Sequence, residues 1–256
     1  MNPNRQSLLS DDDPPPVEII NPGGSSPFLL IGDHAGNAVP ERLDRLGVAE
    51  AELHRHIGWD IGIAALGEQL ATLIDASFVR QAYSRLVIDC NRDPEAADAV
   101  PEVSDGTRIP ANVGLALEQR QRRIAEIHAP YQQAIADALA RRDRPGEPAV
   151  LVALHSFTPR FAGMDRPWQI GVLHHKGEPA FALRVLKALR AMGGLVVGDN
   201  QPYQMDGIDY SVPRHAYPTR RPYVELEIRQ DLIDDMPGQS RWAAIVEAAL
   251  AAARAG

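Results

Sequence analysis

The stretch Pro27–His34 (PFLLIGDH) decides the fold that the sequence predicts. Its first five residues are a short apolar run bounded by turn residues, a pattern typical of a strand buried in a parallel or mixed sheet. The polar residues Gly32, Asp33 and His34 follow at the carboxyl end of that strand. In open α/β sheets the ligand crevice lies outside the carboxyl ends of the strands, so we expect chemistry there.

Strands and helices alternate along the rest of the chain. Hydrophobic periodicity predicts helices over 61–74, 115–142, 179–192 and 240–254, and extended segments over 78–89, 149–154, 169–173, 195–197 and 223–228. This alternation predicts a three-layer α/β/α sandwich around a mixed, mostly parallel sheet. The long patternless stretches 93–114 and 200–222 are expected to be functional loops. Within the second, residues 200–203 form a predicted turn at the mouth of the crevice.

The first 26 residues differ in composition from the rest. Residues 1–26 are rich in Asp, Pro, Gly and Ser, which predicts a flexible N-terminal tail. Residues 27–256 are expected to form a single domain, because their length suits one α/β unit with a sizeable core.

Composition excludes several classes of partner. The net charge of −8 argues against binding nucleic acid through the whole surface, because phosphate contacts need clustered Lys and Arg. Cys90 is the only cysteine, so the chain cannot form an intramolecular disulfide, and we expect it to be a small buried side chain. The sequence shows neither a signal peptide nor a membrane-spanning segment. We therefore expect a cytoplasmic protein without nucleic-acid or membrane partners.

Two histidines follow predicted buried strands and can converge on one crevice. His34 lies in the motif DHAGN, and His155 follows the strand 149–154. Zinc favours His and carboxylate ligands, and a catalytic site keeps one position open. The third ligand is expected to be an oxygen, with Asp60 as the first candidate and Asn37 or Asp33 as alternatives. An Asp that opens a helix is also an ordinary N-cap.

Arginines occur where an anionic small molecule could bind. The segment 84–92 (SRLVIDCNR) contains Arg85 and the pair Asn91-Arg92. A guanidinium grips a carboxylate through two parallel hydrogen bonds, so we predict substrate contacts, with a salt bridge to Asp89 or Asp93 as the alternative. Further candidates for substrate binding are Arg214 and His215, in the second long loop.

Two glutamates alternate on the predicted strand 223–228. Glu225 and Glu227 share one face, because side chains alternate with period two along a strand. A carboxylate beside a metal site can take a proton from water. Glu227 is the predicted base because it is nearer the carboxyl end. The alternative interpretation is an edge strand with one solvated face.

These motifs, in this order, resemble those of the N-formylglutamate amidohydrolase family. Members of that family are similar in fold to zinc carboxypeptidases (phosphorylase/hydrolase-like). The resemblance implies hydrolysis of the amide bond of a small N-acyl acidic amino acid such as N-formyl-L-glutamate. It also implies that His34 and His155 bind zinc, that Asn91 and Arg92 hold a substrate carboxylate, and that Glu227 activates water.

One position departs from the carboxypeptidase pattern. Zinc carboxypeptidases carry His-x-x-Glu at the first site, whereas this chain has His34 followed by Asn37, and Asn is a poor zinc ligand. Two alternatives therefore stay open: a related zinc enzyme that acts on another N-acyl amino acid or peptide, and a metal-free protein that binds a small anion.

Overall fold

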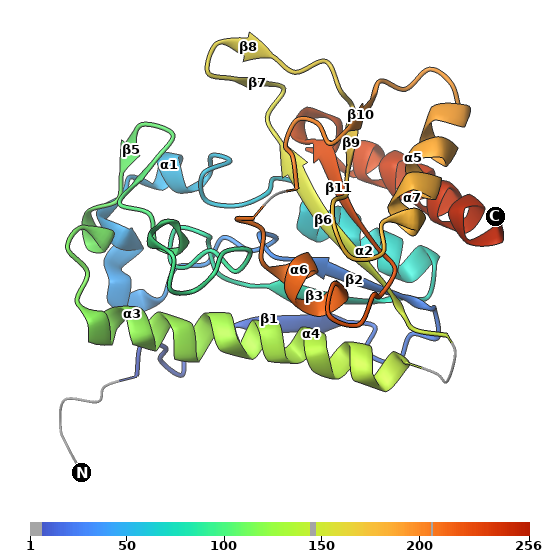
Figure 1. Cartoon of the computed structure of the whole chain (residues 1–256). Coiled ribbons are helices and arrows are strands. Elements are labelled where there is room, and N and C mark those ends of the chain that lie inside the picture. Colours follow the sequence, from blue (N-terminus) through green and yellow to red (C-terminus); the bar gives the residue numbers. More distant parts are fainter. Residues whose placement is uncertain (1–6, 144–146, 206) are drawn as a thin grey trace.

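A seven-stranded sheet forms the centre of the computed structural model, which describes residues 7–143, 147–205 and 207–256 (Figure 1). The strand order is β1-β3-β2-β6-β11-β9-β10. The four central strands run parallel, whereas β1 is antiparallel to β3 and β9 is antiparallel to β11, which confirms the mixed, mostly parallel sheet. The strands are β1 (Val17–Ile20), β2 (Phe28–Gly32), β3 (Ser77–Gln81), β6 (Val150–Phe157), β9 (Ile170–Leu173), β10 (Val197–Asp199) and β11 (Tyr223–Arg229).

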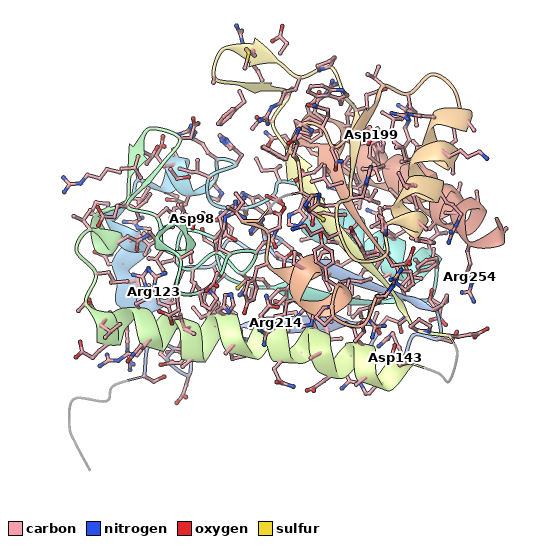
Figure 2. All side chains as sticks on the ribbon, viewed as in Figure 1. Asp98, Arg123, Asp143, Asp199, Arg214 and Arg254 are labelled. Atoms are coloured by element: carbon pink, nitrogen blue, oxygen red, sulfur yellow. The ribbon has the colours of Figure 1, made fainter. Side chains whose placement is uncertain are left out.

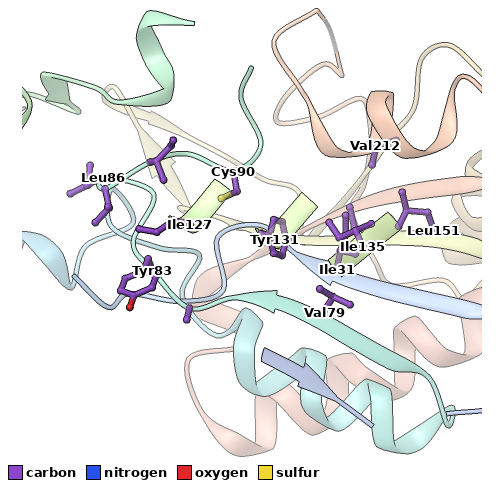
Figure 3. Close-up of a cluster of buried hydrophobic side chains, with 14 of the residues drawn as sticks. Ile31, Val79, Tyr83, Leu86, Cys90, Ile127, Tyr131, Ile135, Leu151 and Val212 are labelled. Atoms are coloured by element: carbon purple, nitrogen blue, oxygen red, sulfur yellow. The ribbon is translucent and has the colours of Figure 1, made fainter. Parts of the chain in front are cut away.

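Helices cover both faces of the sheet, so the α/β/α sandwich is confirmed. One face packs against α2 (Ile63–Leu73), α5 (Ala180–Ala191) and α7 (Met236–Ala255). The other face packs against α4 (Ala129–Arg142) and α6 (Ser211–Ala216). Figure 3 shows the core on this second face, with Tyr131 and Ile135 of α4 beside Ile31 of β2.

The predicted helix over 115–142 is one rod that runs across the lower edge of Figure 1. It consists of α3 (Leu117–Arg123), a π turn at Ile124–His128, and α4. The π turn precedes Pro130, which has no backbone N–H to donate, and this explains why the regular hydrogen-bond ladder is interrupted there.

The last helix begins four residues before its predicted start at 240. The Asp235 side chain accepts a hydrogen bond of 2.7 Å from the Gly238 amide, and Pro237 lies in the first turn, where its missing N–H costs nothing. Among the described helices, none combines the length and the apolar character that crossing a membrane requires. The shorter elements are α1 (Glu50–Leu53), β4 (Val103–Ser104), β5 (Thr107–Arg108), β7 (Arg160–Phe161), β8 (Met164–Asp165) and 3₁₀ turns at Glu41–Gly47, Ala97–Ala99, Pro110–Asn112 and Gln230–Leu232.

The prediction of a flexible tail over 1–26 is wrong for the part that the structure describes. β1 pairs with β3, with Val17 opposite Gln81. The Glu126 carboxylate accepts hydrogen bonds from the amides of Leu8 and Leu9, at 2.9 and 3.0 Å. A four-residue, half-buried edge strand between prolines and glycines gives almost no periodic signal. The prediction therefore followed the composition of the surrounding residues and missed the strand. Residues 1–6 of that prediction lie outside the described residues.

The extended segment predicted over 78–89 is also only partly correct. β3 ends at Gln81, and the amides of Ala82, Ser84 and Arg85 bond instead to carbonyls of Pro16, Ala38 and Gly58. The apolar residues 86–88 are buried without pairing in the sheet. Buried Arg123 of α3 donates to the Val87 carbonyl at 2.7 Å and so pins this segment beside the strand ends.

Candidate active site

Polar side chains collect at the carboxyl ends of β2, β6 and β11. Along β6, Leu151 and Ala153 belong to the core under α4, and period-two alternation places His155 on that same face. On β11, Glu225 and Glu227 follow the core residue Tyr223 at the same two-residue spacing and therefore lie on its face of the sheet. Asp33 and His34 follow the end of β2. The parallel register then brings these side chains together.

A cavity of about 410 Å³ opens at these strand ends. Its size suits a small molecule. The polar lining comes from His34, Asp60, Arg85, Asn91, Arg92, His155, Ser156, Glu225 and Glu227, and the loop before α6 adds Pro202, Tyr203, Gln204, Ile208 and Asp209.

His34, Asp60 and His155 form a compact buried cluster that could hold a metal ion. One potential ligand atom from each lies within 4.8 Å of the other two. The Asp60 Oδ2 atom is 2.9 Å from His155 Nδ1 and 3.5 Å from His34 Nδ1. Within the described parts of the chain, His34 Nδ1 has no hydrogen-bond partner. A buried, unpartnered ring nitrogen beside a carboxylate and a second imidazole fits a divalent transition metal.

Each histidine of this cluster has a carboxylate at its other ring nitrogen. His34 Nε2 is 2.7 Å from Asp89 Oδ1, and His155 Nε2 is 3.3 Å from Asp33 Oδ2. Such outer carboxylates fix the orientation and tautomer of metal-ligating histidines. Burial opposes ionisation of Asp89, but Arg85 and His34 outweigh it and hold the pKa of Asp89 well below its usual value.

The other candidates for the third ligand lie in different positions. Asn37 Nδ2 donates to the Leu53 carbonyl at 2.8 Å, and Asn37 is not among the described residues that line the cavity. Asp33 Oδ2 lies 3.3 Å from Nε2 of His155, the ring nitrogen that points away from the cluster. Gly36 lets the DHAGN turn approach the chain closely, because a Cβ there would lie 2.1 Å from the Ala82 carbonyl oxygen. Of the three oxygen candidates, Asp60 is the one beside both histidines.

Glu225 and Glu227 are buried at 2% and 6% exposure. The alternative of a solvated edge strand is wrong, because β11 lies between β6 and β9. Each glutamate has one carboxylate oxygen, Oε2, without a hydrogen-bond partner among the residues that the structure describes. Burial, assisted by the Asp60 charge, raises the pKa of Glu227 to about 8, and burial raises the pKa of Glu225 well above its usual value.

Both predicted substrate arginines line the cavity and also have carboxylate partners of the chain. Arg85 donates to Asp89 Oδ2 from Nε and Nη2, at 3.1 and 2.7 Å, so the alternative of a salt bridge to Asp89 is confirmed. Arg92 Nε donates to Asp98 at 3.1 Å, and its Nη1 lies 3.9 Å from Asp209. Both guanidinium groups therefore have loose contacts with carboxylates of the cavity lining, at 3.7 Å from Arg85 to Asp60 and 3.9 Å from Arg92 to Asp209.

The remaining predicted substrate residues have different positions. Asn91 faces the cavity, but its Oδ1 accepts from the amides of Tyr210 and Ser211, which start α6. Arg214, labelled in Figure 2, is exposed and donates to the Tyr210 hydroxyl. His215 Nε2 lies 2.7 Å from Gln132 Oε1 of α4. Neither Arg214 nor His215 is among the described residues that line the cavity.

Sequence reasoning placed Tyr203 at the mouth of the crevice but missed other contributors. Gln204, Ile208 and Asp209 also line the cavity. The guanidinium of Arg166 stacks over Tyr203 at 4.9 Å and joins this loop to the segment after the β7–β8 hairpin. The length of the loop 200–222 was the only signal for these residues, whereas the outer carboxylate Asp89 lay within the motif 84–92.

Comparison with known proteins identifies the family. Residues 26–234 match the family model for N-formylglutamate amidohydrolase. The chain belongs to the N-formylglutamate amidohydrolase family. It is therefore an amidohydrolase that acts on carbon–nitrogen bonds other than peptide bonds, and the resemblance drawn from its motifs is confirmed.

Two solved structures are similar to this family member over almost their whole length. A gene product from Agrobacterium tumefaciens is 31% identical and has a TM-score of 0.92, with 97% of this chain and 98% of that one covered. The N-formylglutamate amidohydrolase from Ralstonia eutropha is 21% identical with a TM-score of 0.67, covering 94% and 98%, which shows a shared fold. Among curated proteins, no sequence matches this chain.

Proposed function

We propose that the protein is a zinc-dependent hydrolase that cleaves the amide bond of a small N-acyl acidic amino acid, with N-formyl-L-glutamate as the first candidate. The buried cluster of His34, Asp60 and His155 is the observation on which this proposal is based. These three residues would hold the ion, with Asp89 and Asp33 behind the two histidines. Zinc bound there supplies a Lewis acid that polarises the scissile carbonyl and lowers the pKa of water.

Glu227 is the proposed general base. It lies opposite His155 in the β6–β11 register, and its Oε2 has no partner among the described residues. A buried carboxylate in this position could accept a proton from the attacking water and return it to the leaving nitrogen. Glu225 lies one step deeper in the strand, about 6.6 Å away by strand rise, and is not assigned this role.

Arg92, with Arg85 and Asn91 beside it, would bind the substrate carboxylates. Both arginines face the cavity while ion pairs with the chain hold their guanidinium groups in place. A fixed guanidinium loses little freedom on binding a carboxylate. Arg214 and His215 are not part of the proposal, because they lie outside the cavity lining. The partner is accordingly a small anionic molecule.

A metal-free anion-binding protein is the less favoured alternative. Asp60, Glu225 and Glu227 all line the cavity and are buried. Arg85 and Arg92 are paired with Asp89 and Asp98, so a bound metal ion would offset the cost of burying these carboxyl groups together. Related zinc enzymes with another acyl group or amino acid differ from the proposal only in substrate.

Metal analysis combined with a matched substrate panel tests the proposal. Purified protein should carry close to one zinc ion per chain, and chelation should abolish activity. N-formyl-L-glutamate should be hydrolysed faster than N-formyl-L-glutamine, which has the same shape without the side-chain charge, and N-acetyl-L-glutamate tests the acyl group. Full activity of metal-free protein, or equal rates for the glutamate and glutamine substrates, would contradict the proposal.

A further inference from the structure

Ser211, the first residue of α6, lies beneath the candidate metal cluster with no exposed surface. Its hydroxyl donates a hydrogen bond of 2.5 Å to Asp33 Oδ1. The other oxygen of Asp33 faces His155 Nε2 at 3.3 Å. A serine that no sequence motif singled out is therefore one carboxylate away from a candidate metal ligand.

The groups around Ser211 determine which atom donates and which accepts in this series of hydrogen bonds. The amide group of Gln132 donates to the Cys90 carbonyl at 2.8 Å and to Ser211 Oγ at 3.0 Å. Because the Ser211 oxygen accepts from Gln132, its single proton has two acceptors, Asp33 Oδ1 at 2.5 Å and the Cys90 carbonyl at 3.3 Å, and the shorter bond to the charged carboxylate is the stronger one. The second oxygen of Asp33 lies 3.3 Å from His155 Nε2, an ion-pair contact without hydrogen-bond geometry, while Nδ1 of His155 faces Asp60 at 2.9 Å.

The backbone of the same residue reaches the other histidine. The amide of Ser211 donates to Asn91 Oδ1 at 3.0 Å. The amide of Asn91 donates at 2.9 Å to Asp89 Oδ1, the oxygen that lies 2.7 Å from His34 Nε2. Ser211 is thus connected to both outer carboxylates, to one through its side chain and to the other through its main chain.

We propose that Ser211 is a positioning residue that sets the orientation of His155 through Asp33, so that Nδ1 of the histidine is presented to the metal. The inference rests on the proposed function for the presence of the metal. Ser211 is not among the described residues of the metal cluster or of the cavity lining, and its hydroxyl acts through Asp33. Because α6 begins two residues after Asp209 of the cavity lining, Ser211 joins the cavity-lining loop before α6 to the metal site.

Removal of the hydroxyl alone tests this role. Ser211→Ala should lower the zinc affinity of the folded protein by up to about 10-fold, the lower end of the 10–100-fold effect of losing a direct outer partner such as Asp33. kcat at saturating zinc should fall while KM changes little, since the backbone bonds of Ser211 to Asn91 remain. Ser211→Cys, which fills the space but donates weakly, should resemble Ser211→Ala. Zinc affinity is measured by competition with a chromogenic chelator, and circular dichroism checks folding.

Ser77→Ala is the matched control. Ser77 is equally buried, and its hydroxyl donates to the Asn21 carbonyl. It lies in β3, away from the cavity lining, so this variant should keep wild-type zinc affinity. Wild-type zinc affinity in Ser211→Ala, or an equal loss in Ser77→Ala, would overturn the positioning role while leaving the proposed function intact. A wild-type protein that binds no zinc would overturn both.

Discussion

Glu227 of β11 lies directly opposite His155 of β6 in a parallel register, whereas Glu225 lies opposite Ala153. Both glutamates point to the sheet face that carries the cavity. The carboxyl group next to a candidate metal ligand is therefore Glu227, and Glu225 is one step farther from the strand end. The sequence favours Glu227 for its place nearer the carboxyl end of the strand, and the register adds its position opposite a candidate metal ligand.

Glu227→Gln keeps the shape of the side chain and removes its proton acceptor. We expect kcat to fall roughly 10²–10⁴-fold, the usual contribution of a general base, with metal content unchanged. Steady-state kinetics and metal analysis measure both quantities. Glu225→Gln is the control and should have the smaller effect. A larger effect of Glu225→Gln would show that Glu225 is the base.

Asp60→Asn tests the third metal ligand. The change removes the charged oxygen beside both histidines, so zinc affinity should fall by roughly 100-fold or more, beyond the loss that an outer partner alone causes. The double change of His34 and His155 to Ala should abolish binding. Asn37→Ala is the control, because Asn37 bonds to the Leu53 carbonyl, and it should retain the metal. Loss of zinc in Asn37→Ala with retention in Asp60→Asn would reverse this assignment.

Arg92→Ala should raise KM for an acidic N-acyl substrate. The substrate carboxylate loses its guanidinium partner, at a cost of roughly 2–5 kcal/mol. Arg92→Lys should restore binding only in part, since lysine lacks the planar fork. Arg160, which is exposed on the β7–β8 hairpin, provides the control Arg160→Ala. Unchanged KM and kcat in Arg92→Ala would mean that Arg92 serves only its ion pair with Asp98.

Gly171→Ala should displace the loop that lines the cavity. Gly171 lies opposite Glu227, and a Cβ at this position would be 1.9 Å from the Gln201 carbonyl oxygen. The neighbouring Pro202 and Tyr203 line the cavity, so kcat/KM should fall by about 10²-fold, the effect of a displacement near 1 Å. Gly23→Ala adds a Cβ that meets nothing within 4 Å and should be neutral. Wild-type kinetics in Gly171→Ala would show that the loop adapts without loss.

His215 should make stability depend on pH. Burial, with the nearby Arg214 charge, lowers the pKa of His215 to about 4 in the folded protein, whereas the unfolded value is near 6.5. The unfolded chain therefore binds more protons than the folded protein between these pH values. The contribution of neutral His215 to the free energy of unfolding is fully present above pH 6.5 and is lost as the pH falls towards 4. The shift corresponds to at most about 3 kcal/mol.

Urea unfolding at pH 7 and pH 4.5 measures this contribution. His215→Gln, which cannot titrate, should lose less stability than the wild type on acidification. His54→Gln changes an exposed histidine and should behave like the wild type. Identical acid sensitivity of wild type and His215→Gln would disprove the linkage.

Local pattern predicted most of the fold and the centre of the site. Apolar runs and helical spacing located the buried strands and covering helices, because period and burial are local properties of the sequence. The same reasoning placed His34 and His155 at strand ends and gave Glu225 and Glu227 a common face. The motif order also indicated the family.

The tertiary structure decided which side chains meet. Asp60 is distinguished from Asn37 and Asp33 as the candidate third metal ligand only by its contacts with two histidines that follow or lie on different strands. The segment 82–92 takes its shape from carbonyls far away in the sequence, and Ser211 reaches Asp33 across 178 positions. Likewise, a strand as short as β1 becomes visible only through its pairing with β3. Sequence periodicity indicates which face of its own helix or strand a residue occupies. The conformation of loops and edge strands depends instead on hydrogen-bond partners that are distant in the sequence, and no local pattern encodes these partners.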